Sequence, residues 1–268
     1  MFIYTTLIIL IEKKNINNLS VLTGFSVYLY FCTYFGAIFA VRQLLAQAIC
    51  YLSIVYIKDK KLVKFILITI IASLVHRSAL IWLLAYFIFN KRISNNAIIL
   101  LFVTCFCIGL FGQKIYPVMV RTFISPLITK GEIFNRIYYY TFYYTETYTN
   151  SFVKIGASII KRMLFIPFFL LYRREIESKG KYMKGIMNLY LVGNCFYLLF
   201  STSFVIFQRA LGFFCSFEIY LLPCLIYMFK HKSSKMIFCI CYFCYGLLKI
   251  YSQIVQFPDA LSVYKTIF

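Results

Sequence analysis

Three short elements of the sequence place ionisable side chains within or between long apolar runs. Arg42 stands between two such runs, the pair His76–Arg77 interrupts a third, and Gln208–Arg209 lies between two more. A charged group at membrane depth is costly and faces protein or water, so each of these residues is a candidate for function. A guanidinium group binds two phosphate oxygens at once and stays charged, whereas imidazole titrates near neutral pH. These residue types favour chemistry on an anionic substrate such as a lipid-linked phosphate.

Each candidate also has a plainer interpretation. Arg42 and Arg209 could extend to the lipid head groups from a helix end or a turn, as long basic side chains do. Lys161 and Arg162, inside a further apolar run, could contact a buried phosphate or extend to the interface in the same way. The pair His76–Arg77 is harder to place at an interface, because no other base lies near it.

The elements that position these residues must be membrane helices. The chain has 268 residues, of which 62% are hydrophobic and 13% are charged. In soluble domains about 45–50% of residues are hydrophobic and about 25% are charged, so the composition excludes a soluble fold. It predicts an all-α, polytopic integral membrane protein of about eight to ten transmembrane or re-entrant helices. We expect a single membrane domain over residues 1–268 with one longer external loop at about 121–154.

Apolar runs locate the predicted helices. The opening segment Phe2–Ile11 is too short to span a membrane, so we expect the N-terminus to be truncated relative to a complete set of spans. A break is expected at Ser73–Ser78, where His76 and Arg77 interrupt a long run. The full set of runs is Leu19–Ala40, Leu44–Ile57, Leu62–Phe89, Ala97–Val120, Ile155–Tyr172, Ile186–Phe207, Ala210–Phe229 and Met236–Val255.

The charge of the chain is strongly positive. Twenty-eight Lys and Arg residues face eight acids, which gives a net charge of +20. Because the bases cluster between apolar runs, lipid head groups and topology explain most of them, rather than nucleic acid. Placing these clusters in the cytoplasm puts residues 91–92 inside, the Tyr-rich stretch 121–154 outside, and Arg42, His76–Arg77 and Gln208–Arg209 toward the outer face.

Two further features have open interpretations. All ten cysteines lie in apolar stretches, and the one CxxC pair has no second pair or His cluster beside it, so they are expected to pack as small hydrophobic residues. No metal site is predicted.

The Tyr-rich segment 138–148 fits either an interfacial aromatic belt or a platform on which sugar rings stack.

Three short motifs follow one another along the chain: residues 41–46 (VRQLLA), Lys64-Phe65 and residues 71–80 (IASLVHRSAL). In order and spacing they resemble the R-Q-x-x-A, K-F and A-S-x-x-H-x-S-A-L elements of the EpsG family of Wzy-type polysaccharide polymerases. Residues 208–214 (QRALGFF) resemble the Arg-containing stretch near the family's C-terminus. Two features depart from the family pattern. Position 75 is Val where the family often has an aromatic residue, and the family's N-terminal acidic-aromatic D-Y element has no counterpart.

The resemblance implies a multi-pass enzyme of the bacterial cytoplasmic membrane, active in capsule, O-antigen or exopolysaccharide biosynthesis. Such an enzyme transfers a growing glycan between undecaprenyl-diphosphate-linked oligosaccharide repeat units at the outer leaflet. No cofactor and no metal are expected, because arginines can neutralise the leaving diphosphate. The expected partners are the lipid-linked substrate, the bilayer, and the chain-length regulator and flippase of the same pathway, with no nucleic acid.

The resemblance also implies roles for individual residues. Arg42, His76 and Arg209 are the predicted catalytic residues, with the arginines on the diphosphate and His76 accepting or orienting the proton of the acceptor hydroxyl. Glu132 and Glu146, the acids of the external loop, are alternative bases. The predicted substrate-binding residues are Gln43, Arg77, Gln208, Lys161, Arg162, Glu132 and Glu146.

Two other classes of function stay open. A flippase or transporter for lipid-linked oligosaccharide is less favoured, because Glu218 is the only acid within the apolar runs and no repeated halves are evident. A non-catalytic membrane subunit or fragment is the third possibility.

Overall fold

The computed structural model describes residues 19–34, 41–124, 135, 139, 151–202 and 205–256. Within these ranges the regular structure is helical, and no strand occurs. The predicted all-α fold is confirmed. The candidate bases Glu132 and Glu146 and nearly all of the Tyr-rich segment 138–148 lie outside the described residues.

The chain divides into two compact units, and each is described by itself. The first comprises Met1–Asn90, Pro167–Met187 and Phe217–Phe268, and the second comprises Lys91–Ile166 and Asn188–Ser216. The expectation of a single membrane domain over the whole chain stays a prediction.

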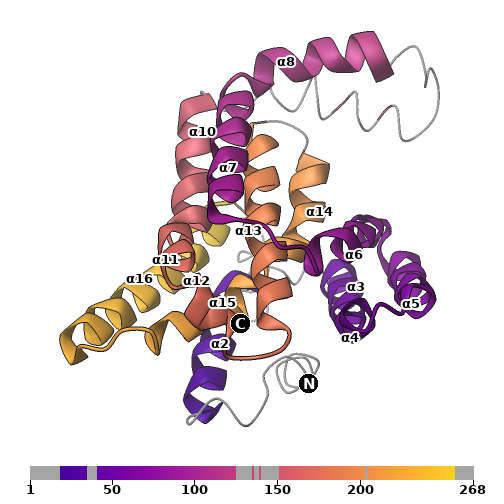
Figure 1. Ribbon diagram of the computed structural model, residues 1–268. Coiled ribbons are helices and arrows are strands. Elements are labelled where there is room, and N and C mark those ends of the chain that lie inside the picture. Colours follow the sequence, from indigo (N-terminus) through magenta and orange to yellow (C-terminus); the bar gives the residue numbers. More distant parts are fainter. Residues whose placement is uncertain are drawn as a thin grey trace, which may run out of the picture. The chain divides into compact units, whose positions relative to one another are not determined.

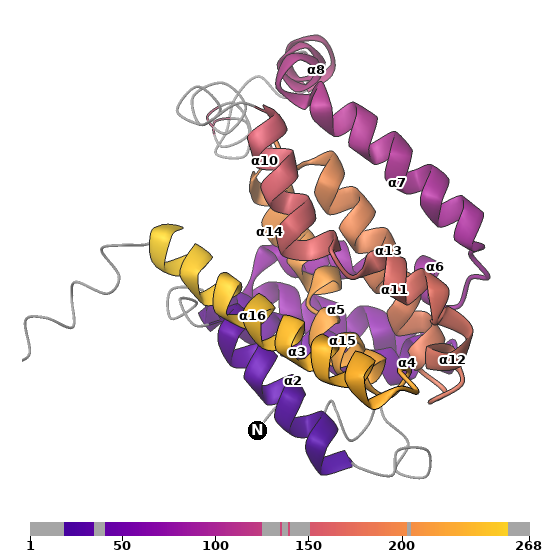
Figure 2. The same cartoon turned by 90° about the vertical axis from the view of Figure 1, so that its left-hand side faces the viewer.

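The first unit contains two groups of packed helices. α3, α5 and the 3₁₀ helix η3 pack against one another, with α4 and α6 beside them (Figure 1). α2 packs against α15 and α16, and Figure 2 shows α2 and α16 running alongside each other. The bounds are α2 (Leu19–Tyr34), α3 (Val41–Leu52), α4 (Ile54–Lys58), α5 (Leu62–Val75), η3 (Arg77–Trp82), α6 (Leu83–Phe89), α12 (Arg173–Glu177), α15 (Glu218–Ile226) and α16 (Lys232–Gln256).

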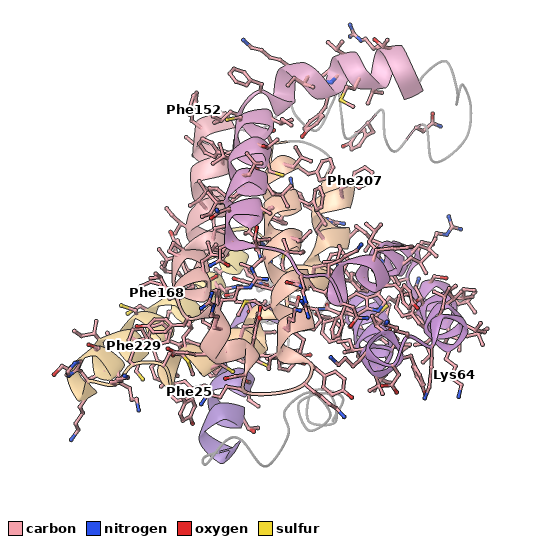
Figure 3. The ribbon with its side chains drawn as sticks, in the orientation of Figure 1. Phe25, Lys64, Phe152, Phe168, Phe207 and Phe229 are labelled. Atoms are coloured by element: carbon pink, nitrogen blue, oxygen red, sulfur yellow. The ribbon has the colours of Figure 1, made fainter. Side chains whose placement is uncertain are left out.

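Aromatic side chains join α2 to α16. Phe25, labelled in Figure 3, meets Tyr242 edge-on with ring centroids 5.3 Å apart. The Tyr28 hydroxyl donates to the carbonyl oxygen of Phe243 at 2.8 Å. The buried side chains of α16 recur every three or four residues, so they form one stripe of the helix, as its period requires. They are Phe238, Tyr242, Tyr245 and Lys249.

The second unit depends on a close approach of two helices. A Cβ atom on Gly109 of α7 would lie 2.7 Å from the carbonyl oxygen of Leu198 on α13. The Thr202 hydroxyl then donates to the Gly109 carbonyl at 3.1 Å. Small residues permit such approaches between membrane helices. The helices are α7 (Asn95–Leu110), α8 (Gly112–Met119), the π-helical turn η4 (Val120–Ile124), α10 (Ser151–Ser158), the π-helical turn η6 (Ile159–Met163) and α14 (Val205–Cys215), while α11 (Ile166–Leu171) and α13 (Met183–Leu199) have residues in both units.

Several apolar runs are interrupted. The run Leu62–Phe89 breaks at His76, whose backbone is extended at φ −150° and ψ 116°. This break lies inside the predicted interval Ser73–Ser78. A second run bends by 79° between Asn95–Leu110 and Lys114–Thr122.

These interruptions reduce the number of long spans. Among the described residues two helices are long and apolar enough to cross a membrane, Phe207–Ile226 and Lys232–Val255, and the bent pair would make a third. This is fewer than the eight to ten helices predicted, because the breaks leave pieces such as Leu62–Val75 shorter than the ~20 residues that a span needs. The fold is that of an all-α membrane protein, and the side assigned to each basic cluster stays a prediction.

Candidate functional site

Arg42 and Gln43 lie in the first turn of α3. The buried residues of this helix are Ala46, Gln47, Cys50 and Tyr51, a spacing that gives one buried stripe along an amphipathic helix. Arg42 precedes Ala46 by one helical turn, so it continues this stripe at the N-terminal end. The Arg42 side chain is exposed and that of Gln43 is half-buried. The first turn therefore presents a guanidinium group where the helix dipole is also positive.

His76 is the hinge between α5 and η3. Its backbone N–H donates to the Ala72 carbonyl at 3.0 Å, and its own carbonyl accepts from the N–H of Ala79 at 2.9 Å. Its ring nitrogen Nδ1 accepts from the backbone N–H of Ser78 at 3.3 Å and lies 2.5 Å from the Ser78 hydroxyl oxygen. The His76 ring is half-buried, and Arg77, which follows it, is exposed.

A single tryptophan, Trp82, holds this hinge against α3, the helix that carries Arg42. Trp82, at the end of η3, is fully buried and its indole N–H donates to the Ser53 hydroxyl at 2.8 Å. Ser53 in turn donates to the carbonyl of Cys50 at 2.6 Å. The Tyr51 ring lies 5.5 Å from the Trp82 ring and stacks on Phe217 at 4.6 Å. These contacts fix η3 against the C-terminal end of α3.

The first unit thus places Arg42, His76 and Arg77 on elements that pack against each other, α3 and η3. The K-F element lies on α5, which contacts both. Phe65 is buried in this packing, whereas Lys64 is exposed and projects outward, as Figure 3 shows.

The remaining candidates belong to the second unit. Gln208 is half-buried, and its amide N–H donates at 2.5 Å to the carbonyl of Phe200, the residue that follows α13. Phe207 stacks on Phe200 with centroids 5.0 Å apart. Arg209, the next residue along α14, is exposed.

Lys161 and Arg162 lie in the π-helical turn η6. The Arg162 guanidinium lies 4.4 Å from the centre of the Tyr197 ring, and its backbone carbonyl accepts from the Tyr190 hydroxyl at 3.2 Å. Lys161 is exposed and Arg162 is half-buried. A cation over an aromatic face is a stabilising contact. Arg162 therefore stabilises the packing against α13 and also carries a positive charge.

An ion pair at the contact of α15 with α16 was not predicted from the sequence. Lys249 Nζ lies 3.1 Å from Glu218 Oε2 with both residues buried. Lys249 is a lone base inside the run Met236–Val255, and an isolated charge at membrane depth is the signal that could have found it. For metals, the described residues contain no group of three His, Cys, Asp or Glu side chains placed to hold an ion.

Comparison with known proteins gives one result. The sequence matches the EpsG family over residues 1–266. No curated protein and no solved structure matches it. The matched range includes every candidate residue described above, and because it extends over nearly all of the 268 residues, the chain belongs to the EpsG family.

Proposed function

We propose that this chain is a polysaccharide polymerase that acts on undecaprenyl-diphosphate-linked oligosaccharide repeat units at the outer leaflet of the bacterial cytoplasmic membrane. One observation carries the proposal: α3, with Arg42 in its first turn, packs against η3, which begins at Arg77 directly after His76. Two guanidinium groups and an imidazole thus lie on adjoining elements of a membrane protein. Membership of the EpsG family supports polysaccharide biosynthesis as the process.

The arginines suit the leaving group of this reaction. In the transfer, the acceptor hydroxyl oxygen forms a bond to the anomeric carbon of the growing glycan, and the bond from that carbon to the diphosphate oxygen breaks. Negative charge develops on the departing diphosphate. Arg42 and Arg77 would bind its oxygens, as paired hydrogen bonds from a guanidinium do, and the N-terminus of α3 adds positive potential. Arg209, on α14 of the second unit, stays a predicted diphosphate-binding residue. This electrostatic mechanism requires neither a metal nor a cofactor.

The acceptor side needs an orienting group and a base. His76 would accept or orient the proton of the acceptor hydroxyl, and Glu132 and Glu146 are alternative bases. The further predicted substrate contacts are Gln43, Gln208, Lys161 and Arg162.

Deletion of the gene tests the proposal. We expect the deletion strain to lose long polymer and to accumulate single lipid-linked repeats, which a pulse of labelled sugar followed by lipid extraction would detect. Re-expression of the wild-type chain should restore the polymer, and a variant without the Arg42 guanidinium should not. Normal polymer in the deletion strain would rule the proposal out.

A flippase for the same lipid-linked substrate is the second candidate, and one observation favours it. Glu218 is a buried carboxylate within an apolar helix, the kind of group that ion-coupled transport uses. Its pairing with Lys249 already compensates the negative charge, which is why we prefer the polymerase. If the chain is a flippase, its deletion would leave the outer leaflet without lipid-linked repeats. Deletion of a polymerase would let the repeats accumulate there. A non-catalytic subunit would tolerate loss of the Arg42 guanidinium.

A further inference from the structure

The contact between Ser78 and the His76 ring determines where the ring carries its hydrogen. The backbone N–H of Ser78 points at Nδ1 from 3.3 Å, and an N–H group can only donate. Nδ1 must therefore be the acceptor, with its lone pair on this side of the ring. The hydrogen of the neutral ring is then on Nε2.

The Ser78 hydroxyl strengthens this arrangement. Its oxygen lies 2.5 Å from Nδ1, at the short end of the range of an O–H donor. Hydroxyl and backbone N–H then converge on one acceptor atom at the first residues of η3. A hydrogen on Nδ1 would point at the backbone N–H of Ser78, which can only donate, and the Ser78 hydroxyl would have to rotate to accept it.

We propose that Ser78 is a positioning residue that holds His76 as the Nε2–H tautomer, so that His76 donates a hydrogen bond to the substrate instead of accepting a proton. The role toward substrate rests on the proposed function, whereas the tautomer does not. The strongest acceptors in the proposed substrate are the anionic oxygens of the diphosphate. In place of the proton-accepting or orienting role given to His76 above, His76 then joins Arg42 and Arg77 as a donor to that group. The proton of the acceptor hydroxyl passes to another base, for which Glu132 and Glu146 are the predicted carboxylates.

Nitrogen NMR tests the tautomer without any assay of activity. The chain has two histidines, His76 and His231, so His231→Gln in the full-length protein leaves one ring to observe. With ¹⁵N-histidine labelling in detergent micelles at neutral pH, we expect Nδ1 to resonate as an unprotonated nitrogen and Nε2 as a protonated one. The reverse assignment, or two averaged shifts, would overturn the proposal.

Serine variants test the role of Ser78. Ser78→Ala should move the two ring shifts toward each other, and Ser78→Thr, which keeps the hydroxyl, should restore the wild-type spectrum. Ser73→Ala is the matched control, because the Ser73 hydroxyl donates to the Ile70 carbonyl on the preceding turn. Its spectrum should equal that of the wild type. An unchanged spectrum in Ser78→Ala would remove Ser78 from the role.

Amide substitutions of His76 separate a donor from a base. The Gln side-chain NH₂ group extends about as far as Nε2 and can donate but not act as a base, whereas Asn keeps an acceptor near Nδ1 that can cap η3. Loss of a hydrogen bond to a charged group lowers the yield of polymer by about 10–100-fold. We therefore expect His76→Gln to make about 10–100 times more polymer than His76→Ala, and His76→Asn to make about as little as His76→Ala. Equal, near-complete loss in Gln and Ala is the result for a general base, worth about 10²–10⁴-fold, and would refute the donor role. If the wild-type chain makes no polymer, the proposed function fails and the spectra still decide the tautomer.

Discussion

Lys249 Nζ on α16 lies 3.1 Å from Glu218 Oε2 on α15, and the two side chains are 10% and 3% exposed. The second carboxylate oxygen, Oε1, has no hydrogen-bond partner among the described residues. The Lys249 ammonium also lies 5.0 Å from the centre of the Tyr245 ring. Lys249 is therefore the main compensation for a charge that has been removed from water.

Removing one partner of this pair should be more harmful than removing both. Lys249→Met leaves a buried carboxylate without its cation, which typically costs about 3–5 kcal/mol. The double variant Lys249→Met with Glu218→Gln should recover most of this loss. Thermal unfolding in detergent of the wild type, Lys249→Met, Glu218→Gln and the double variant would complete one double-mutant cycle.

The exposed pair Lys61–Asp59 supplies the control. Its nitrogen and oxygen lie 3.5 Å apart with side chains about half exposed, and such pairs contribute about 0–1 kcal/mol. Lys61→Met should leave the unfolding temperature almost unchanged. If Lys249→Met is as mild as Lys61→Met, the buried pair does not stabilise the contact of α15 with α16.

The hydrogen bond from Trp82 to Ser53 gives a second prediction. Ser53→Ala deprives a fully buried indole N–H of the acceptor at 2.8 Å. Leaving a buried donor without its partner costs about 1–3 kcal/mol, so the denaturation midpoint should fall. Trp82 is the only tryptophan in the chain, so its fluorescence reports directly on this site.

Ser178→Ala is the matched variant for this test. The Ser178 hydroxyl is exposed and donates to the Glu175 carbonyl within one turn. Surface changes of this kind stay within about 0.5 kcal/mol. A Ser53→Ala protein with the same midpoint as Ser178→Ala would show that the indole bond does not hold η3.

The close approach at Gly109 predicts a steric defect. An alanine methyl group at this position would meet the Leu198 carbonyl oxygen at 2.7 Å, and backbone cannot move aside as a flexible side chain can. Overpacking typically costs about 1–3 kcal/mol. Gly156→Ala, on α10 of the same unit, meets nothing within 4 Å and should stabilise its helix by up to about 1 kcal/mol. Opposite signs of the two changes in unfolding temperature are expected, and a stabilising Gly109→Ala would contradict the helix contact.

Local signals predicted a good part of the fold. Hydropathy alone identified the helical class, and the pair His76–Arg77 marked the break in the run Leu62–Phe89, because an imidazole and a guanidinium disturb an apolar helix at the position where they stand. The same signal singled out Arg42, which the structure places on a helix packed against η3.

The tertiary contacts could not be predicted in this way. Trp82 and Ser53 are 29 positions apart and Lys249 and Glu218 are 31 apart, so nothing in either neighbourhood indicates its partner. The bend that follows α7 also coincides with a contact between residues far apart in the sequence. There the Tyr116 hydroxyl donates to the Leu199 carbonyl at 2.6 Å, which joins α8 to the distant end of α13. Long-range contacts of this kind divide runs that hydropathy treats as continuous.

Charge alone should not replace the guanidinium of Arg42. Lys keeps the positive charge but offers a single ammonium where Arg donates from a planar fork. Arg42→Lys should therefore lower the yield of polymer by about 10–100-fold, as expected for a lost hydrogen bond to a charged group. We expect Arg42→Ala and Arg209→Ala to abolish elongation, and His76→Ala to lower it by about 10–100-fold, all with normal amounts of protein. Polymer ladders on gels, with an immunoblot of the membrane fraction, would measure both.

Arg174→Ala provides the comparison for the arginine variants. This side chain is exposed on α12 and belongs to a basic cluster that topology explains. It should support a normal polymer ladder. Any of the three candidate variants that matches it would lose its place in the proposed site.

The predicted topology can be tested at two exposed positions. Arg92 belongs to a basic cluster expected in the cytoplasm, and Tyr139 lies in the loop expected outside; both side chains are exposed. All ten native cysteines are free thiols, so they must first be replaced. In that background, a membrane-impermeant maleimide should label Tyr139→Cys in intact cells and Arg92→Cys only after the membrane is opened. Labelling of Arg92→Cys in intact cells would invert the assignment, and Arg42 and His76 would then face the cytoplasmic leaflet, away from the outer-leaflet substrate that the polymerase proposal requires.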